Sequence, residues 1–406
     1  MFPRKFFLIS FIFLFSVSIY AEFIGSVEFD KNAGRAPEFV KKREPLLAIE
    51  WAVPLKKNQV QVNRREEAGV TLFGEDILVA ARSGELHLFG KNGELKLTAV
   101  FEGECTVAPV AVDETHALVS VSNSVFMMEL VTEKKGEKTK YNWKILWNVA
   151  GKATVAAQPF IYEDKLVLIQ FHDSVIYVVD KESGELKNMY SDYENSEELA
   201  VIRLAQPVIV DGKIVFGFSD GTITFFMLRD EGKVDLIPYY KFKTANSMRK
   251  FEKRDFFDVL SFVQIEDSIL FSGGEYGGVI VDGKPVKLEN MEDLQLFKYE
   301  NGFAGFGRRG IFLFDENGKF KTQPFKSMNY VTNLVTGNGF AVAMTSGEGP
   351  MLGDTDAFIY LLSPDFTKVY YSMMIPNGVS SNAVCGNGAV YFVSDMGVLY
   401  KFKVLK

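Results

Sequence analysis

The chain has 406 residues, of which 47% are hydrophobic and 24% are charged, and its formal net charge is −7 at pH 7. This acidic balance excludes a protein that holds nucleic acid or anionic lipid through bulk charge. The only histidines, His87, His116 and His172, are too few and too scattered for a His-rich metal site. Length alone would suggest two or three domains.

The N-terminal 21 residues have the parts of a signal peptide. Arg4 and Lys5 form a basic start, residues 6–20 form an apolar core of 15 residues, and Ala21 is a suitable cleavage position. A membrane-spanning helix needs about 20 residues, so an uncleaved anchor is the less favoured alternative. No cysteine lies near Ala21, so no lipid-modified N-terminus is encoded. We therefore expect an exported, periplasmic protein.

Residues 22–45 are polar and charged, which predicts a linker between the signal peptide and the folded domain. The next run, LLAIEWAVPL from Leu46 to Leu55, is apolar enough to form a strand.

From Ala68 onward the chain repeats one pattern eight times: an apolar β-rich run, a tight turn, a second run, a Gly-containing turn and a third run. The repeats begin near Ala68, Thr106, Thr154, Leu204, Asp258, Leu294, Val331 and Ser380. Their mean spacing of about 45 residues fits one four-stranded blade per repeat. The repeat overrides the expectation from length. It predicts one all-β domain over residues 46–406, an eight-bladed β-propeller of four-stranded antiparallel blades.

The third and fourth repeats give the clearest internal alignment. Residues 159–179 lie without a gap on residues 207–227, which places His172 at the position of Asp220, in a blade turn. Two-residue hairpins need positive φ, and Asp-Gly or Asn-Gly supplies it. We therefore expect tight turns at Asp211–Gly212, Asn301–Gly302 and Asn387–Gly388.

The eighth repeat is too short for a complete blade. It starts near Ser380 and the chain stops at Lys406, which leaves room for about three strands. We expect residues Leu46 to Leu55 to supply the fourth, outer strand and so to join the first blade to the last. The alternative is a free N-terminal tail.

Motifs that carry chemistry are largely missing from the sequence. No nucleophile elbow, Walker loop, HExxH or CxxC occurs. The one GxGxxG match, Gly305 to Gly310, is followed by an apparent blade strand, whereas a dinucleotide site needs a helix there. Cys105 and Cys385 belong to blades that are not adjacent, which favours two small buried side chains over a disulfide.

One loop offers candidate metal ligands. Glu348, Asp354 and Asp356 lie in the enlarged second turn of the seventh repeat, and carboxylate oxygens suit a hard cation. A solvated loop is the favoured interpretation, so we expect no metal and no cofactor.

Two basic runs, Thr132 to Trp147 and Met248 to Phe257, interrupt the acidic chain. Such runs are usually solvated faces. Together they would form a positive patch that steers a partner.

The repeats resemble the PQQ-type propeller repeat, best in VVDKESGELKN from Val178 to Asn188, where Asn188 takes the position of the expected Trp. Within that superfamily the chain is similar to the BamB family, a propeller subunit of the outer-membrane β-barrel assembly machinery. The resemblance implies a non-enzymatic scaffold that is a monomer within a complex. It implies a protein partner, the POTRA domains of the barrel-inserting subunit, with no nucleic acid and at most a peripheral outer-membrane association. The lipid-bearing cysteine of that family is missing here.

The same resemblance implies a docking surface. An apolar-Arg pair of that family falls on Ile202 and Arg203, and an aspartate that opens the next blade falls on Asp258. The spacing from Arg203 to Pro207 is one residue shorter than in the family, and Leu260 replaces a second expected aspartate.

Two other functions remain open at this point. A propeller that binds a sugar, a peptide or a cell-wall fragment is compatible with the fold. A PQQ-dependent dehydrogenase is disfavoured, because the chain has no adjacent cysteines and only three tryptophans, Trp51, Trp143 and Trp147.

Overall fold

The computed structural model describes residues 45–55, 66, 68–136, 138–191, 204–230, 232–243, 259–265, 268–274, 276–281, 284–308, 310–337, 339–347, 356–386 and 388–405. The predicted signal peptide and nearly all of the predicted linker lie outside these ranges. Within them, no helix is long and apolar enough to cross a membrane.

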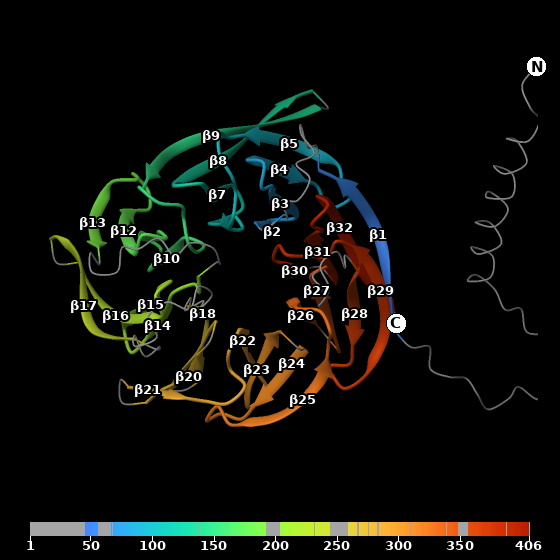
Figure 1. Cartoon of the computed structure of the whole chain (residues 1–406). Coiled ribbons are helices and arrows are strands. Elements are labelled where there is room, and N and C mark those ends of the chain that lie inside the picture. Colours follow the sequence, from blue (N-terminus) through green and yellow to red (C-terminus); the bar gives the residue numbers. More distant parts are fainter. Residues whose placement is uncertain are drawn as a thin grey trace, which may run out of the picture. The chain divides into compact units, whose positions relative to one another are not determined.

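The described residues form eight four-stranded antiparallel sheets arranged around a centre, which confirms the eight-bladed propeller (Figure 1). In seven blades the four strands follow one another in sequence from the inside of the ring to its outside (Figure 1). The eighth blade takes its outer strand from the N-terminal end of the domain.

The strand bounds show how regularly the blades repeat. Blade 1 contains β2 (Gly69–Phe73), β3 (Asp76–Ala80), β4 (Glu85–Phe89) and β5 (Leu95–Val100). Blade 2 contains β6 (Val110–Ala111), β7 (His116–Val121), β8 (Ser124–Lys135) and β9 (Lys138–Ala150). Blade 3 contains β10 (Phe160–Tyr162), β11 (Leu166–Gln170), β12 (Val175–Asp180) and β13 (Leu186–Ser191). Blade 4 contains β14 (Val208–Val210), β15 (Lys213–Gly217), β16 (Thr222–Asp230) and β17 (Val234–Lys243).

The second half of the ring has the same plan. Blade 5 contains β18 (Val259–Ile265), β19 (Ser268–Gly273), β20 (Gly277–Val281) and β21 (Lys284–Lys287). Blade 6 contains β22 (Leu294–Tyr299), β23 (Gly302–Gly307), β24 (Gly310–Phe314) and β25 (Phe320–Lys326). Blade 7 contains β26 (Val331–Gly337), β27 (Phe340–Thr345), β28 (Asp356–Leu362) and β29 (Val369–Pro376). Blade 8 contains β30 (Val384–Gly386), β31 (Ala389–Val393), β32 (Val398–Leu405) and β1 (Leu46–Pro54).

The predicted N-terminal clasp is confirmed by the pairing of β1 with β32. The two strands run antiparallel, with Leu46 opposite Leu405 and Pro54 opposite Val398 (Figure 1). Leu47 is only 4% exposed and packs with side chains of blades 7 and 8. The fourth strand of the last blade therefore comes from residues that precede the first blade.

Turn chemistry explains most hairpins, with one correction. Asp211 (φ 49°) and Gly212 (φ 70°) form the expected two-residue turn between β14 and β15. The expectation for Asn301–Gly302 is wrong, because the positive φ of 50° falls at Glu300, while Gly302 already opposes Tyr299 in the ladder. Gly388 has a φ of 73° between β30 and β31.

The gapless alignment of the third and fourth repeats is also corrected. Three residues separate β10 from β11, whereas two separate β14 from β15. After this extra residue, the turn between the second and third strands is equivalent in the two blades with Phe171 in the place of Phe218. The Phe171 N–H donates to Val175 O just as the Phe218 N–H donates to Thr222 O. His172 therefore does not match Asp220.

The hydrophobic core lies between neighbouring blades. Leu168 and Val178 of blade 3, for example, belong to one buried cluster with Phe216 and Phe226 of blade 4. Each sheet thus buries both faces, which one blade alone would leave exposed to water.

The two cysteines lie in separate clusters. Cys105 is buried with side chains of blades 1 and 2, whereas Cys385 packs partly against the cluster of blades 7 and 8. Both thiols are free. Burial, followed by the charges of Glu66 and Glu85, raises the pKa of the Cys105 thiol to about 12. This thiol is therefore protonated and unreactive at neutral pH.

A β-bulge recurs in the outer strands and orients a link to the next blade. One extra residue stands in the outer ladder at Glu50, Lys96, Leu146, Lys187, Tyr239 and Tyr370. Such bulges re-aim the neighbouring side chains.

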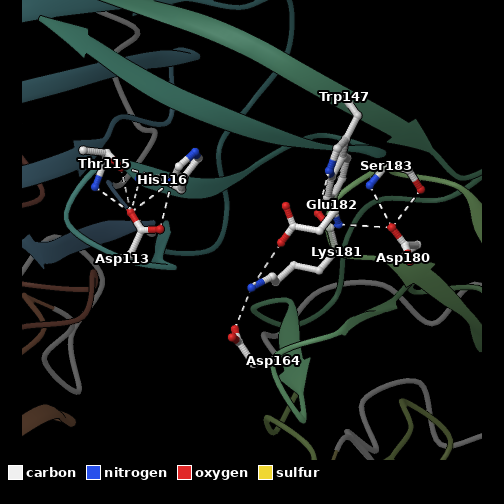
Figure 2. A network of polar contacts seen from close by, with 9 residues as sticks. All are labelled: Asp113, Thr115, His116, Trp147, Asp164, Asp180, Lys181, Glu182 and Ser183. Atoms are coloured by element: carbon white, nitrogen blue, oxygen red, sulfur yellow. Dashed lines mark hydrogen bonds and ion pairs between the residues drawn. The ribbon is translucent and has the colours of Figure 1, made fainter.

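The residues directly after three of these bulges bond to the following blade. The indole N–H of Trp51 donates to Lys91 O (3.2 Å), and that of Trp147 donates to Lys181 O (2.8 Å; Figure 2). The amide of Asn188 donates to Asp235 Oδ1 at 3.1 Å. Asn188, which takes the position of the Trp expected in the PQQ-type repeat, therefore links blades 3 and 4 through a polar contact.

Candidate partner-binding surface

The up-and-down course of each blade gives the ring two different rims. Turns between second and third strands, and connections between blades, lie on one rim, which we call the crossover rim. Turns between first and second strands, and between third and fourth strands, lie on the opposite rim, which we call the hairpin rim.

The residues that the resemblance implies for docking, Ile202, Arg203 and Asp258, lie outside the described residues. Their described neighbours in sequence belong to the crossover rim at blades 3 to 5. The Leu204 N–H donates to Ala156 O (2.9 Å), and the Ala205 N–H donates to Val259 O (2.9 Å). Ala205, two residues after Arg203, is thus hydrogen-bonded to Val259, the residue after Asp258.

The same part of the ring is braced by buried contacts. The Val259 N–H donates to Phe218 O at 3.3 Å, and the Gln170 amide donates to Gly217 O at 2.7 Å. A Cβ added at Gly217 would lie 2.4 Å from Val259 Cβ, so this close approach of blades 4 and 5 requires glycine. The flanks of the predicted docking residues are therefore rigidly supported.

Amide side chains near the start of the innermost strands form a set of links that the sequence analysis missed. Gln158 donates to Ala108 O at 3.0 Å, and Asn333 donates to Ser381 O at 2.7 Å. Asn382 accepts from the Val70 N–H at 3.0 Å and donates to Val70 O at 3.2 Å. These bonds join blades 2 with 3, 7 with 8, and 8 with 1 through side chains. An amide just before the first strand (Gln158, Asn382) or early within it (Asn333) was the available signal.

A partly buried acid on the crossover rim, Asp293, has a partner from the next blade. The Tyr330 hydroxyl donates to Asp293 Oδ1 at 3.0 Å. Burial raises the pKa of the Asp293 carboxyl above its usual range, against the lowering effects of this hydrogen bond and of Arg308. Burial, followed by the charge of Asp293, also raises the pKa of the Tyr330 phenol. The pair connects blades 6 and 7.

On the hairpin rim, charged side chains hold turns together (Figure 2). Asp113 Oδ1 accepts from the backbone N–H groups of Thr115 (2.7 Å) and His116 (2.8 Å), and His116 Nδ1 lies 2.8 Å from Asp113 Oδ2. Partial burial opposes these hydrogen bonds, but they lower the pKa of Asp113 to about 2. The carboxylate therefore closes the turn between β6 and β7 and stays ionised.

A second set of charged side chains on this rim surrounds Lys181, whose own side chain is 12% exposed. Its ammonium lies 2.6 Å from Asp164 and 3.4 Å from Glu182 (Figure 2). The Lys181 carbonyl accepts the Trp147 indole N–H, so this ion-paired turn is also the support of the link from blade 2.

The metal candidates are not brought together by the structure as far as it is described. Glu348 and Asp354 lie outside the described residues, and Asp356 opens β28 with its backbone opposite Pro376. Among the described side chains, no group of three or more His, Cys, Asp or Glu residues could hold a metal ion.

The GxGxxG match is part of a hairpin, as the sequence indicated. Gly305 lies in β23, and Gly307 opposes Gly310 at the start of β24. No helix follows, so the phosphate-binding geometry of a dinucleotide fold is not formed.

Comparisons with known proteins agree with this architecture. A family model described as outer membrane protein assembly factor BamB matches residues 130–282. BamB from Moraxella catarrhalis has a TM-score of 0.65 and 15% sequence identity, covering 88% of this chain and 100% of that chain. The computationally designed Ika8 protein has a TM-score of 0.61 and 11% identity, covering 84% of this chain and 98% of that chain.

Saccharomyces cerevisiae Sqt1 is also similar, with a TM-score of 0.58 and 12% identity over 85% of this chain and 97% of that chain. No curated protein sequence matches the chain. Identities this low show the fold alone. The class is therefore a closed eight-bladed β-propeller. More particularly, the chain is similar to BamB, through the family model over residues 130–282 and through the propeller fold.

Proposed function

We propose that the chain is a non-enzymatic, exported scaffold that binds a protein partner during assembly of outer-membrane β-barrel proteins. Its partner in this proposal is the POTRA region of the barrel-inserting subunit. The BamB family model supports the role, because the matched residues 130–282 include both halves of the expected docking surface. No cofactor is needed for a function of this kind.

The observation that carries the proposal is the hydrogen bond from the Ala205 N–H to Val259 O (2.9 Å). It holds the chain just after Arg203 against the chain just after Asp258, on the crossover rim. A positive and a negative side chain at such a junction would present a charged docking point on a rigid support. Electrostatic complementarity of this kind sets register and specificity.

The proposal is tested by recovery of partners from an envelope fraction with the full chain as bait. The wild-type chain should recover the barrel-inserting subunit, and Arg203→Glu should reduce recovery by about tenfold or more. Arg229→Glu is the matched control, because this exposed arginine lies on β16 of blade 4, towards the hairpin rim. Equal recovery by wild type and a folded Arg203→Glu chain would overturn the proposed docking surface.

A further inference from the structure

The outer strands of blades 4 and 5 differ in length. β17 of blade 4 has ten residues, whereas β21 of blade 5 has four, and both lie on the outside of the ring (Figure 1). In blades 7 and 8 the corresponding strands are nearly equal, because β29 has eight residues and β1 has nine. A strand of four residues can cover less of the neighbouring blade than a strand of nine.

Two tyrosines of β17 show the effect of this difference. Tyr239 is the extra residue of the outer bulge in blade 4 and Tyr240 follows it, and Tyr370 and Tyr371 hold the same two places in blade 7. Tyr370 and Tyr371 pack against the buried cluster of blades 7 and 8. In blade 4, Tyr239 is 60% exposed and Tyr240 is 38% exposed. Equivalent tyrosines are thus partly covered in blade 7 and exposed in blade 4.

Tyr240 belongs to a row of aromatic rings that leads to the crossover rim. Its ring centre lies 6.2 Å from that of Phe225 and 5.9 Å from that of Phe242. The Phe242 ring lies 6.5 Å from the ring of the buried Phe271, which stacks on the Tyr276 ring at 5.9 Å. Tyr276 lies in the turn between β19 and β20. We call the exposed or half-buried rings of Phe225, Tyr240, Phe242 and Tyr276 the aromatic stripe.

The aromatic stripe continues into the junction on which the proposed function depends. Three of its rings pack against the buried cluster that contains Ala205 and Val259. Val259 pairs with Gly273, whose N–H donates to Tyr276 O at 2.8 Å. A partner that docks at this junction on the crossover rim would therefore lie next to Tyr276, the first ring of the stripe.

The hydroxyl groups of three tyrosines at this surface are available to a partner. Within the described part of the chain, the hydroxyls of Tyr239, Tyr240 and Tyr276 form no hydrogen bond, whereas the Tyr299 hydroxyl donates to Pro364 O. Tyrosine is enriched at protein interfaces because its ring buries apolar area while its hydroxyl can still hydrogen-bond. These side chains have the properties of interface residues.

We propose that the partner of the proposed function also covers the aromatic stripe, so that it binds across the crossover rim and over the outer side of blades 4 and 5. This inference rests on the proposed function. The charged junction orients the partner, and apolar side chains of the partner bury the rings of the stripe. The partner region must therefore present an apolar face beside its charged contact.

Isothermal titration calorimetry with the purified POTRA region tests the inference through matched variants. Tyr240→Ala should weaken binding by about tenfold, because a few interface residues, tyrosine prominent among them, carry most of the affinity. Tyr371→Ala removes the same atoms at the equivalent place in blade 7 and should bind like wild type. Arg203→Glu reports on the proposed function itself, since it changes the junction and leaves the stripe intact.

Cross-linking gives a second measurement that keeps an aromatic ring at each position. Benzoylphenylalanine substituted for Tyr240 should form a photo-induced cross-link to the POTRA region, and the same group substituted for Tyr371 should form none. If circular dichroism shows that Tyr240→Ala does not fold, this cross-link decides the question.

The outcomes separate this inference from the proposed function. If Arg203→Glu weakens binding, but a folded Tyr240→Ala binds like wild type and position 240 gives no cross-link, the inference alone is overturned. If the folded wild-type chain does not bind the POTRA region, the proposed function is overturned and the inference with it. Binding to phospholipid vesicles or self-association that Tyr240→Ala abolishes, with unchanged affinity for the POTRA region, would assign the stripe to a different occupant and overturn the inference.

Discussion

At the scale of single residues, the ring is joined by partly buried polar contacts between blades. Asp293 and Tyr330 illustrate the cost of such a contact, because burial raises the pKa of the carboxyl even though the phenol donates to it. A raised folded-state pKa means that folding becomes less favourable as pH rises and the acid ionises. The partly buried charge of Asp293 therefore lowers the free energy of unfolding at neutral pH.

We predict that Asp293→Asn increases the free energy of unfolding at pH 7 by about 0.5 to 1 kcal/mol. The amide oxygen can still accept from Tyr330, and Asn tolerates the positive φ of 58° at this position. Denaturant unfolding at several pH values measures the effect. The difference from wild type should vanish as pH falls below about 4, where Asp293 is neutral in both states. A variant less stable than wild type at pH 7 would contradict this account.

Trp147 provides a second prediction at this scale. Its ring is 7% exposed and packs on Gly184, where a Cβ would lie 2.5 Å from Trp147 Cγ. Trp147→Ala should lower the free energy of unfolding by about 3 to 5 kcal/mol. Trp147→Phe keeps most of the packing and loses the bond to Lys181 O, so it should cost less. Equal losses in the two variants, measured by denaturant unfolding, would show that ring packing is not the main contribution.

At the scale of elements, β1 is the strand that completes the ring. Its ladder with β32 and the burial of Leu47 join the N-terminal end of the domain to the last blade. Without β1, the outer edge of β32 would be unpaired and the core around Leu47 would be open to water. Unpaired edges and exposed apolar surface favour aggregation.

We predict that a chain beginning at Lys56 is unstable, whereas a chain beginning at Pro45 folds. The longer chain keeps β1 and is the matched control. Thermal unfolding followed by circular dichroism should show one cooperative transition for the chain from Pro45 and a much lower or absent transition for the shorter one. Similar unfolding temperatures for the two would mean that β1 does not close the ring.

Elements could be predicted from the sequence where local patterns decide them. Apolar alternation and turn residues such as Asp211–Gly212 located the blades, and the short last repeat indicated that Leu46 to Leu55 belongs to blade 8. Predictions from local patterns were wrong where a turn contains one more residue than expected or begins one residue earlier. The extra residue between β10 and β11 shifted the alignment at His172, and the turn at Glu300 was placed one residue late. The outer bulges carry no local signal of this kind.

At the scale of the whole ring, the candidate site was less predictable than the fold. Arg203 and Asp258 are far apart in sequence, and only a resemblance to a family selected them. The structure adds that their flanks meet through Ala205 and Val259. Contacts between blades depend on closure of the ring, so a single repeat cannot encode them. Amides recur near the first strands of several repeats, but the backbone group that each one bonds, as Asn382 bonds to Val70, depends on this closure.

The most direct test of the central claim is the affinity of the purified chain for the purified POTRA region of the barrel-inserting subunit, measured by isothermal titration calorimetry. The account predicts saturable binding by wild type and by Arg229→Glu, and binding weakened by about tenfold or more in Arg203→Glu. No heat of binding with the folded wild-type chain would contradict the proposed function. An affinity unchanged by Arg203→Glu would contradict the proposed surface.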